Sequence, residues 1–273
     1  MDARPALRQR LISRPARPMI VAHRGVWGDA PENALPAIEA ARAYDMVEID
    51  VQLSADGVPV LVHDPTLDRT AGLPARVDAL TAARLAAVSL RAGLGGPDAA
   101  MTPHRVPTLE EGLQAGGPGL LFDLDVKAPH DIEAVAAQVA AHPARDRCML
   151  KMDVAAPEDI AALRAVERRH GLCVIAKTLL NRVEDVTLLE AARDAGIAAA
   201  EIWFADPDLL ARATATSLPI TTYTLRDVHN PGLDDGRALT DPGAVWGLLI
   251  DTGIAAIMTD EAAALARYLD NRV

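Results

Sequence analysis

Short apolar runs alternate with longer helical patterns along most of the chain, and this alternation limits the possible folds more than any other feature. The runs that predict strands are residues 19–22, 46–53, 120–126, 148–152, 173–177, 199–203, 220–224 and 256–258. The helical patterns are residues 34–44, 132–141, 157–170, 183–195, 207–215, 244–251 and 261–268, and Asn33 is a plausible N-cap for the first. One more helix is expected after Thr108, which has capping-box spacing to Glu111.

Strands that alternate with helices favour parallel pairing, and eight such units in about 250 residues are typical of a (β/α)8 barrel. A doubly wound sheet would need a glycine-rich phosphate loop after its first strand, and the sequence has none there. We therefore predict an α/β protein with a (β/α)8 TIM barrel that spans residues 1–273 as one domain. Residues 54–105 interrupt the alternation, so we expect them to form a small insertion after the second strand.

The overall charge argues against a nucleic-acid partner. Asp and Glu number 38 against 27 Lys and Arg, a net charge of −11, whereas a nucleic-acid binder needs a basic surface. No apolar run approaches the roughly 20 residues of a membrane-spanning helix. Residues 1–18 lack the apolar stretch of a signal peptide. We therefore expect a soluble, cytoplasmic protein without integral membrane association.

Carboxylates occur at the ends of the second and third expected strands, where a barrel places its active site. Glu48 and Asp50 are two residues apart, so they share one face of a strand, and Asp125 ends the next strand. Oxygen ligands of this kind suit Mg²⁺ or Ca²⁺ better than zinc. The alternative is a rim of ion pairs without metal, in which these acids pair with Arg24, Lys127 and Lys151.

Two histidines flank the acidic strand in the sequence, His23 and His63. If both reach the mouth of the barrel, one can accept a proton from the attacking oxygen while the other donates one to the leaving oxygen. Arg24 offers a planar fork suited to phosphate oxygens, and Lys127 offers a point charge. The residues therefore indicate chemistry on a phosphate ester.

These residues fall into motifs that resemble those of the glycerophosphodiester phosphodiesterases, a TIM-barrel family. The matching segments are His23-Arg24-Gly25, Pro31-Glu32-Asn33-Ala34, Glu48-Ile49-Asp50, Asp56-Gly57, Val62-His63-Asp64, Leu67-Asp68-Arg69-Thr70, Asp125-Val126-Lys127 and Thr259-Asp260. The resemblance covers nearly the whole chain and is densest over the first 70 residues.

The resemblance implies a reaction and a role for each matching residue. The reaction is hydrolysis of a small-molecule glycerophosphodiester to glycerol 3-phosphate and an alcohol. The implied metal ligands, for Mg²⁺ or Ca²⁺, are Glu48, Asp50 and Asp125, and the implied acid/base pair is His23 and His63. Arg24 and Lys127 would hold the phosphate, and Glu32 would position the attacking water or His23. The family also has a small inserted subdomain, which would be residues 54–105 here.

Several departures from the family pattern concern the later strands and the choice of substrate. Asp125 replaces a glutamate, and Lys151-Met152-Asp153 replaces Ser-Phe-Asp. The candidates for substrate selectivity are Lys151, Lys177, Trp203 and Tyr223. The two lysines favour a more anionic substrate, unless they pair with Asp153 and Glu201. Two other functions stay open, a phospholipase D-type hydrolase or lyase and a non-catalytic barrel that binds a phosphodiester.

Overall fold

The computed structural model describes residues 7–12 and 17–272. The chain divides into two compact units, which are described separately. One unit comprises Met1–Ala22 with Met149–Val273, and the other is His23–Cys148.

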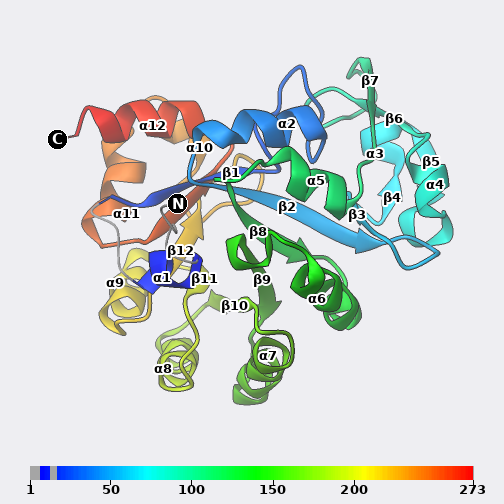
Figure 1. The fold of residues 1–273 in the computed structure, drawn as a ribbon. Helices are drawn as coiled ribbons and strands as arrows, with labels where there is room; N and C mark the ends of the chain where they lie inside the picture. The colour runs from blue at the N-terminus through cyan, green and yellow to red at the C-terminus, as the bar shows by residue number, and fades with distance from the viewer. Residues whose placement is uncertain (1–6, 13–16, 273) are drawn as a thin grey trace. The chain divides into compact units, whose positions relative to one another are not determined.

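The unit that contains both ends of the chain is built on a parallel sheet with the strand order β1-β13-β12-β11-β10-β9 (Figure 1). In sequence order these strands are β1 (Met19–His23), β9 (Cys148–Asp153), β10 (Cys173–Leu180), β11 (Ala200–Phe204), β12 (Ile220–Tyr223) and β13 (Ala256–Thr259). The helices are α1 (Leu7–Ile12), α7 (Pro157–His170), α8 (Val186–Asp194), α9 (Pro207–Ala215), α10 (Asp235–Ala238), α11 (Leu248–Asp251) and α12 (Ala262–Asp270). A 3-10 turn η5 (Val183–Asp185) precedes α8, and a π-helix η6 (Gly243–Gly247) precedes α11.

The other unit carries the two acidic strands side by side. Strand β2 (Met46–Leu53) pairs in parallel with β8 (Leu121–Val126), and this register sets Asp50 opposite Asp125. Its main helices are α2 (Leu35–Ala40), α5 (Leu109–Ala115) and α6 (Ile132–Ala141). The predicted capping box is confirmed, since Thr108 and Glu111 exchange their hydrogen bonds at the start of α5.

Across the described residues, eight strands belong to parallel ladders, and helices follow them in sequence. The predicted (β/α)8 barrel class is therefore confirmed. No helix in residues 7–12 or 17–272 combines the length and the apolar character needed to cross a membrane.

Between β2 and β8 lie additional short elements near the end of β2 (Figure 1). They are β3 (Pro59–Leu61), β4 (Thr66–Leu67), α3 (Asp68–Ala71), β5 (Leu73–Arg76), η2 (Val77–Ala79), α4 (Ala82–Leu85), β6 (Ser89–Arg91) and β7 (Met101–Arg105). Strand β3 pairs antiparallel with β2, whereas β4 with β5 and β6 with β7 form separate two-stranded sheets. The assignment of residues 54–105 as an inserted subdomain of a single domain stays a prediction.

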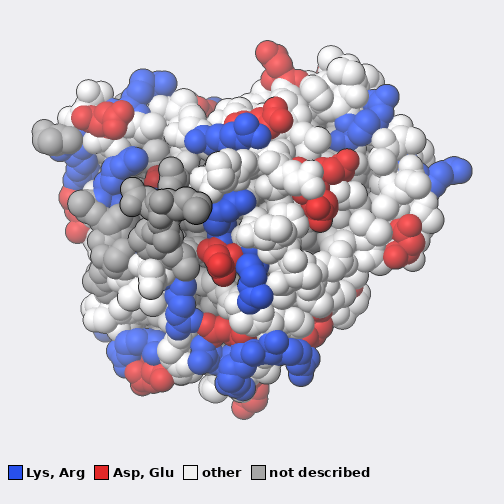
Figure 2. All heavy atoms as spheres, viewed as in Figure 1, with Lys and Arg blue, Asp and Glu red and all other residues white. Residues whose placement is uncertain are grey.

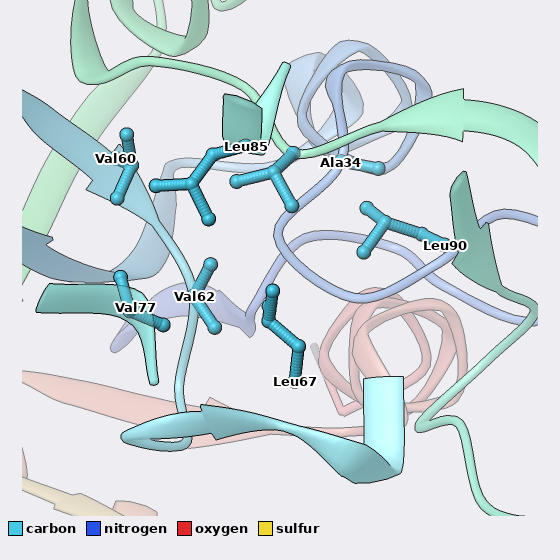
Figure 3. Packing of buried hydrophobic residues seen from close by; sticks show 8 residues of the cluster. Ala34, Val60, Val62, Leu67, Val77, Leu85 and Leu90 are labelled. Carbon is cyan, nitrogen blue, oxygen red and sulfur yellow. The ribbon is translucent and has the colours of Figure 1, made fainter. Parts of the chain in front are cut away.

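A buried aliphatic cluster holds these short elements together (Figure 3). Its members are Ala34, Val60, Val62, Leu67, Val77, Leu85, Leu90 and Val106, and each is at most 4% exposed. Side chains from β3, β4, η2, α4 and β6 therefore share one core although these elements are short. The cluster fixes the backbone on both sides of His63 and just after Arg76.

The first helix begins differently from the prediction. The N-cap position of α2 is Ala34, not Asn33, and no side chain caps the helix there. Asn33 has a left-handed backbone conformation with φ of 57°, and its side chain bonds to Asp50 instead. The N-cap prediction for Asn33 is wrong because a contact with a buried carboxylate outweighs the local capping preference.

Candidate active site

His23 ends β1, and a tight turn follows at Arg24 and Gly25. The His23 side chain is buried, and its carbonyl oxygen accepts a hydrogen bond from Trp27 Nε1 at 3.1 Å. Arg24 has a positive φ of 54°, which turns its backbone N–H toward Glu48 Oε2 at 3.2 Å. Gly25 follows with φ of 86°, and a Cβ there would lie 2.7 Å from the backbone of Ala37. The turn therefore requires glycine at position 25.

The buried Asp50 carboxylate has contacts with three side chains of the site. Asn33 bonds to it twice, donating from Nδ2 to Asp50 Oδ2 at 2.7 Å and accepting the Asp50 backbone N–H at 3.0 Å. Arg24 Nε lies 3.2 Å from the same Oδ2 atom, and Lys127 Nζ lies 2.5 Å from Oδ1. Both oxygens of this buried carboxylate therefore face donors.

These contacts set the charge states of Asp50 and of its two basic partners. Burial by itself would raise the pKa of Asp50, but the charges of Lys127 and Arg24 outweigh burial and hold that pKa well below its usual range. For Lys127, burial opposes the charge, but Asp50 and Asp125 raise the pKa of the ammonium above its ordinary value. The pKa of Arg24 is raised in the same way, because Asp50 and Glu32 outweigh its burial. Asp50, Lys127 and Arg24 are therefore all ionised.

Glu48, Asp50 and Asp125 form an acidic cluster that can hold a metal ion. Each offers one carboxylate oxygen, and these three oxygens lie within 4.8 Å of one another. Glu48 and Asp50 are buried, whereas the Asp125 side chain is 15% exposed. An all-oxygen set of this size fits a hard divalent cation. The present partners of Asp50 and Asp125 also include the ammonium of Lys127, as in the predicted ion-paired alternative.

Glu32 is buried between two arginines. Arg24 Nη1 lies 3.2 and 3.3 Å from its two carboxylate oxygens, and Arg69 donates to the same oxygens at 2.6 and 2.8 Å. Arg69 also binds both oxygens of Asp64, at 2.7 and 3.0 Å. Hydrogen bonds to Glu32 raise the pKa of Arg69 above its ordinary value. Arg69 therefore links the first motif of the site to the segment that carries His63.

His63 is held by its neighbour Asp64. Its Nδ1 atom lies 2.6 Å from Asp64 Oδ1, so a proton on Nδ1 leaves Nε2 available for exchange with a substrate. Burial lowers the pKa of His63 despite the nearby charge of Asp50. Although burial opposes its charge, the hydrogen bond from Arg69 lowers the pKa of Asp64 to about 2. The Gln52 amide fixes the backbone of this segment by donating to the carbonyl oxygens of residues 62, 63 and 64.

The sequence matches a known family along most of its length. The family model described as "Glycerophosphoryl diester phosphodiesterase family" matches residues 23–264. The chain belongs to this family. It is a family of phosphoric diester hydrolases, as the resemblance of the motifs predicts.

Curated relatives of the family match over part of their length. The chain is 37% identical over 123 residues to mouse glycerophosphodiester phosphodiesterase 1, and this match covers 42% of the chain and 36% of the mouse protein. It is 32% identical over 122 residues to a glycerophosphodiester phosphodiesterase of Bacillus subtilis, with 42% of each protein covered. The matches thus span less than half of these relatives.

Solved structures of the family match over nearly the whole chain and show the fold. A glycerophosphoryl diester phosphodiesterase from Parabacteroides distasonis has 22% identity and a TM-score of 0.74, covering 96% of this chain and 91% of that one. A phosphodiesterase from Oleispira antarctica, solved in complex with its product sn-glycerol-3-phosphate, has 22% identity and a TM-score of 0.66. That match covers 93% of this chain and 97% of the other.

Most of the residues that the family motifs single out lie together in the unit of residues 23–148, whereas Thr259 and Asp260 lie in the other unit. Contacts join Arg24, Glu32, Glu48, Asp50, His63, Asp125 and Lys127 directly or through Asn33, Asp64 and Arg69. Sequence reasoning gave no role to Asp64 or Arg69, although both lie within family motifs. Gln52 lies outside the family motifs.

The four candidates for selectivity lie in the other unit and have structural contacts there. Lys151 is buried, and its Nζ atom lies 3.1 Å from Glu201, which is the pairing alternative of the sequence prediction. Lys177 is partly buried. Trp203 donates from Nε1 to the carbonyl oxygen of His229 at 3.0 Å, and Tyr223 is buried. A selectivity role for these residues stays a prediction.

Proposed function

We propose that this protein hydrolyses a small-molecule glycerophosphodiester to glycerol 3-phosphate and an alcohol. The observation that carries the proposal is the cluster of Glu48, Asp50 and Asp125 oxygens within 4.8 Å, in a member of the glycerophosphoryl diester phosphodiesterase family. The naming of mouse and bacterial relatives as glycerophosphodiester phosphodiesterases supports the same reaction. Location in the cytoplasm and a role in lipid metabolism stay predictions from the sequence.

Charged groups at the cluster would bind the phosphodiester and stabilise the charge that develops on it. Glu48, Asp50 and Asp125 would hold Mg²⁺ or Ca²⁺, which when bound supplies positive charge to polarise the phosphoryl group. Lys127 and Arg24 add two cations beside the same acids. Their pairing with Asp50 keeps both side chains oriented before substrate arrives, so less ordering is needed on binding.

Two histidines would move the protons. The contact of His63 Nδ1 with Asp64 favours the tautomer whose Nε2 faces away from Asp64, and Nε2 is then the atom that exchanges a proton with an ester oxygen. His23, at the end of β1, would serve the other oxygen of the displacement. A protein that only bound a phosphodiester would need no histidine with a fixed tautomer.

Turnover of a glycerophosphodiester tests this proposal directly. We expect release of glycerol 3-phosphate by the wild-type protein with Mg²⁺ or Ca²⁺, and its loss with EDTA. His23→Ala and His63→Ala should each lower kcat by at least about 100-fold, the usual contribution of a positioned acid or base. His104→Ala is the matched control, because His104 lies in β7 and takes no part in the contacts that join the site residues. Full activity in both histidine variants contradicts the acid/base assignment.

Metal binding has a readout that does not depend on turnover. Mg²⁺ or Ca²⁺ should raise the Tm of the wild-type protein, because a ligand that binds the folded state stabilises it. Glu48→Gln with Asp125→Asn should abolish that shift. Early appearance of a cyclic glycerol phosphate would identify the neighbouring hydroxyl of the substrate as the nucleophile, and its absence would favour water.

A further inference from the structure

A cavity of about 610 Å³ opens beside the acidic cluster, within the unit of residues 23–148. It is lined by His63 and Lys127 and also by two pairs of charged or polar residues, Arg76 with Asp78 and His130 with Asp131. The size falls within the range of about 300–1,000 Å³ for small-molecule sites. The proposed acid/base pair and the acidic cluster do not account for what this cavity binds.

The cavity is continuous with the groups that would hold the phosphate. Lys127 Nζ bonds to Asp50 and Asp125, and the same side chain lines the cavity. His63, held by Asp64, lines it too. A phosphodiester bound at Lys127 and His63 therefore has one of its two ester groups beside this cavity.

The walls present paired charges. Arg76 donates from Nε and Nη2 to the two Asp78 oxygens at 2.9 and 2.6 Å. In the segment after β8, His130 Nε2 lies 3.5 Å from Asp131 Oδ1. Each pair offers both hydrogen-bond donors and acceptors, and each of the two carboxylates lies beside a basic side chain. A surface of this kind satisfies hydroxyl groups, which both donate and accept.

The same walls are poorly suited to a quaternary ammonium group. Such a group cannot donate an N–H hydrogen bond and is usually held over the faces of Trp, Tyr or Phe. None of those three residue types is among the described residues that line the cavity. Of the two acids that could attract the cation, Asp78 is already paired with Arg76, and Asp131 lies beside the His130 imidazole.

We propose that this cavity binds the alcohol half of the substrate and selects a polyhydroxylated alcohol over choline. The inference rests on the proposed hydrolysis. The glycerol half has three carbons in every substrate of this class, so a cavity of this volume fits the variable half better. Arg76 and Asp78 are then specificity-determining residues contributed by β5 and η2, which the aliphatic cluster holds in place through Val77.

Competing diesters test this specificity. Wild-type kcat/KM should be about 10-fold higher for glycerophosphoinositol than for glycerophosphocholine, the effect of one or two hydrogen bonds to hydroxyl groups. Arg76→Ala with Asp78→Ala should lower the value for the inositol diester about 10-fold and that for the choline diester less than twofold. Arg84→Ala, an exposed arginine outside the cavity, is the control and should leave both unchanged. An equal loss for both diesters overturns the proposal.

Binding separates a failure of the subsite from a failure of the reaction. Calorimetry on the His23→Ala protein should show glycerophosphoinositol binding about 10-fold more tightly than glycerophosphocholine, and the double variant at Arg76 and Asp78 should erase that difference. Equal binding of the two diesters overturns the subsite. Absence of turnover in the wild-type protein, with the binding difference retained, overturns the hydrolysis and supports the subsite.

Discussion

Replacing Asp64 with Asn changes the partner of His63 while keeping its shape. The Nδ1 to Oδ1 contact is 2.6 Å, and the carboxylate is also held by Arg69 on both oxygens, so its position is well defined. An asparagine oxygen still accepts from Nδ1, but the negative charge is lost. We therefore expect Asp64→Asn to weaken turnover without unfolding the site.

The size of the effect follows from the exposure of the pair. A hydrogen bond to a charged group contributes about 1.5–3 kcal/mol when it is buried. The side chains of His63 and Asp64 are 35% and 24% exposed, so solvent screening favours the lower end, about 1.5–2 kcal/mol. At about 1.4 kcal/mol for each factor of ten, kcat/KM should fall about 10- to 30-fold.

The pH profile distinguishes this role from a general loss of structure. Asp64 raises the pKa of His63 through their hydrogen bond, so removing its charge should lower that pKa. The limb of the kcat/KM profile that belongs to His63 should move to lower pH in Asp64→Asn. Asp68→Asn, at an exposed acid four residues later in the sequence, is the control. Activity within twofold of wild type, with an unmoved profile, would refute the reasoning.

Three further predictions concern the stability of the fold. Gly25→Ala should lower the free energy of unfolding by about 2–5 kcal/mol, because alanine is strained at a left-handed φ and its Cβ would clash with the backbone of residue 37. Gly57→Ala is the control, since its Cβ would lie in open space and the variant should lose only about 1–2 kcal/mol through backbone strain. Chemical denaturation measures both losses. Lys151→Ala should cost about 3–5 kcal/mol because it leaves the buried Glu201 carboxylate without its cation, and a Lys151→Met, Glu201→Leu double variant should recover most of that loss. Burial raises the pKa of Asp235 to about 6 from 3.8, so the unfolded chain loses this proton first and stability should fall by up to about 3 kcal/mol as the pH rises from about 4 to 6. Asp235→Asn should flatten that part of the curve in denaturation experiments at several pH values.

The acidic cluster was predictable because it depends on regular structure. Side chains two residues apart share one face of a strand, which brings Glu48 and Asp50 together. Parallel pairing of β2 with β8 then sets Asp50 opposite Asp125, as the family motifs imply. The charges in view are interspersed rather than gathered in one basic stripe (Figure 2), in keeping with the negative net charge.

The supporting contacts were not predictable in the same way. Arg69 reaches Glu32 across 37 residues of sequence and Asp64 across five, and neither spacing corresponds to a helix or strand period. The cavity beside His63 likewise depends on where η2 and the turn after β8 come to lie. Such contacts depend on the tertiary path of loops, which sequence periodicity does not specify.

Asn33 shows why the helix start could not be predicted from the local capping preference of a residue. As an N-cap, an asparagine side chain stabilises a helix by about 1 kcal/mol. A hydrogen bond from its amide to the ionised and buried Asp50 contributes about 1.5–3 kcal/mol, and Asn33 also accepts the Asp50 backbone N–H. Asparagine tolerates a positive φ better than most residues, so the left-handed conformation costs little. The hydrogen bonds to Asp50 therefore outweigh the stabilisation that an N-cap would give. The helix begins after Ala34 without a side-chain cap, because Asn33, the residue suited to cap it, orients Asp50.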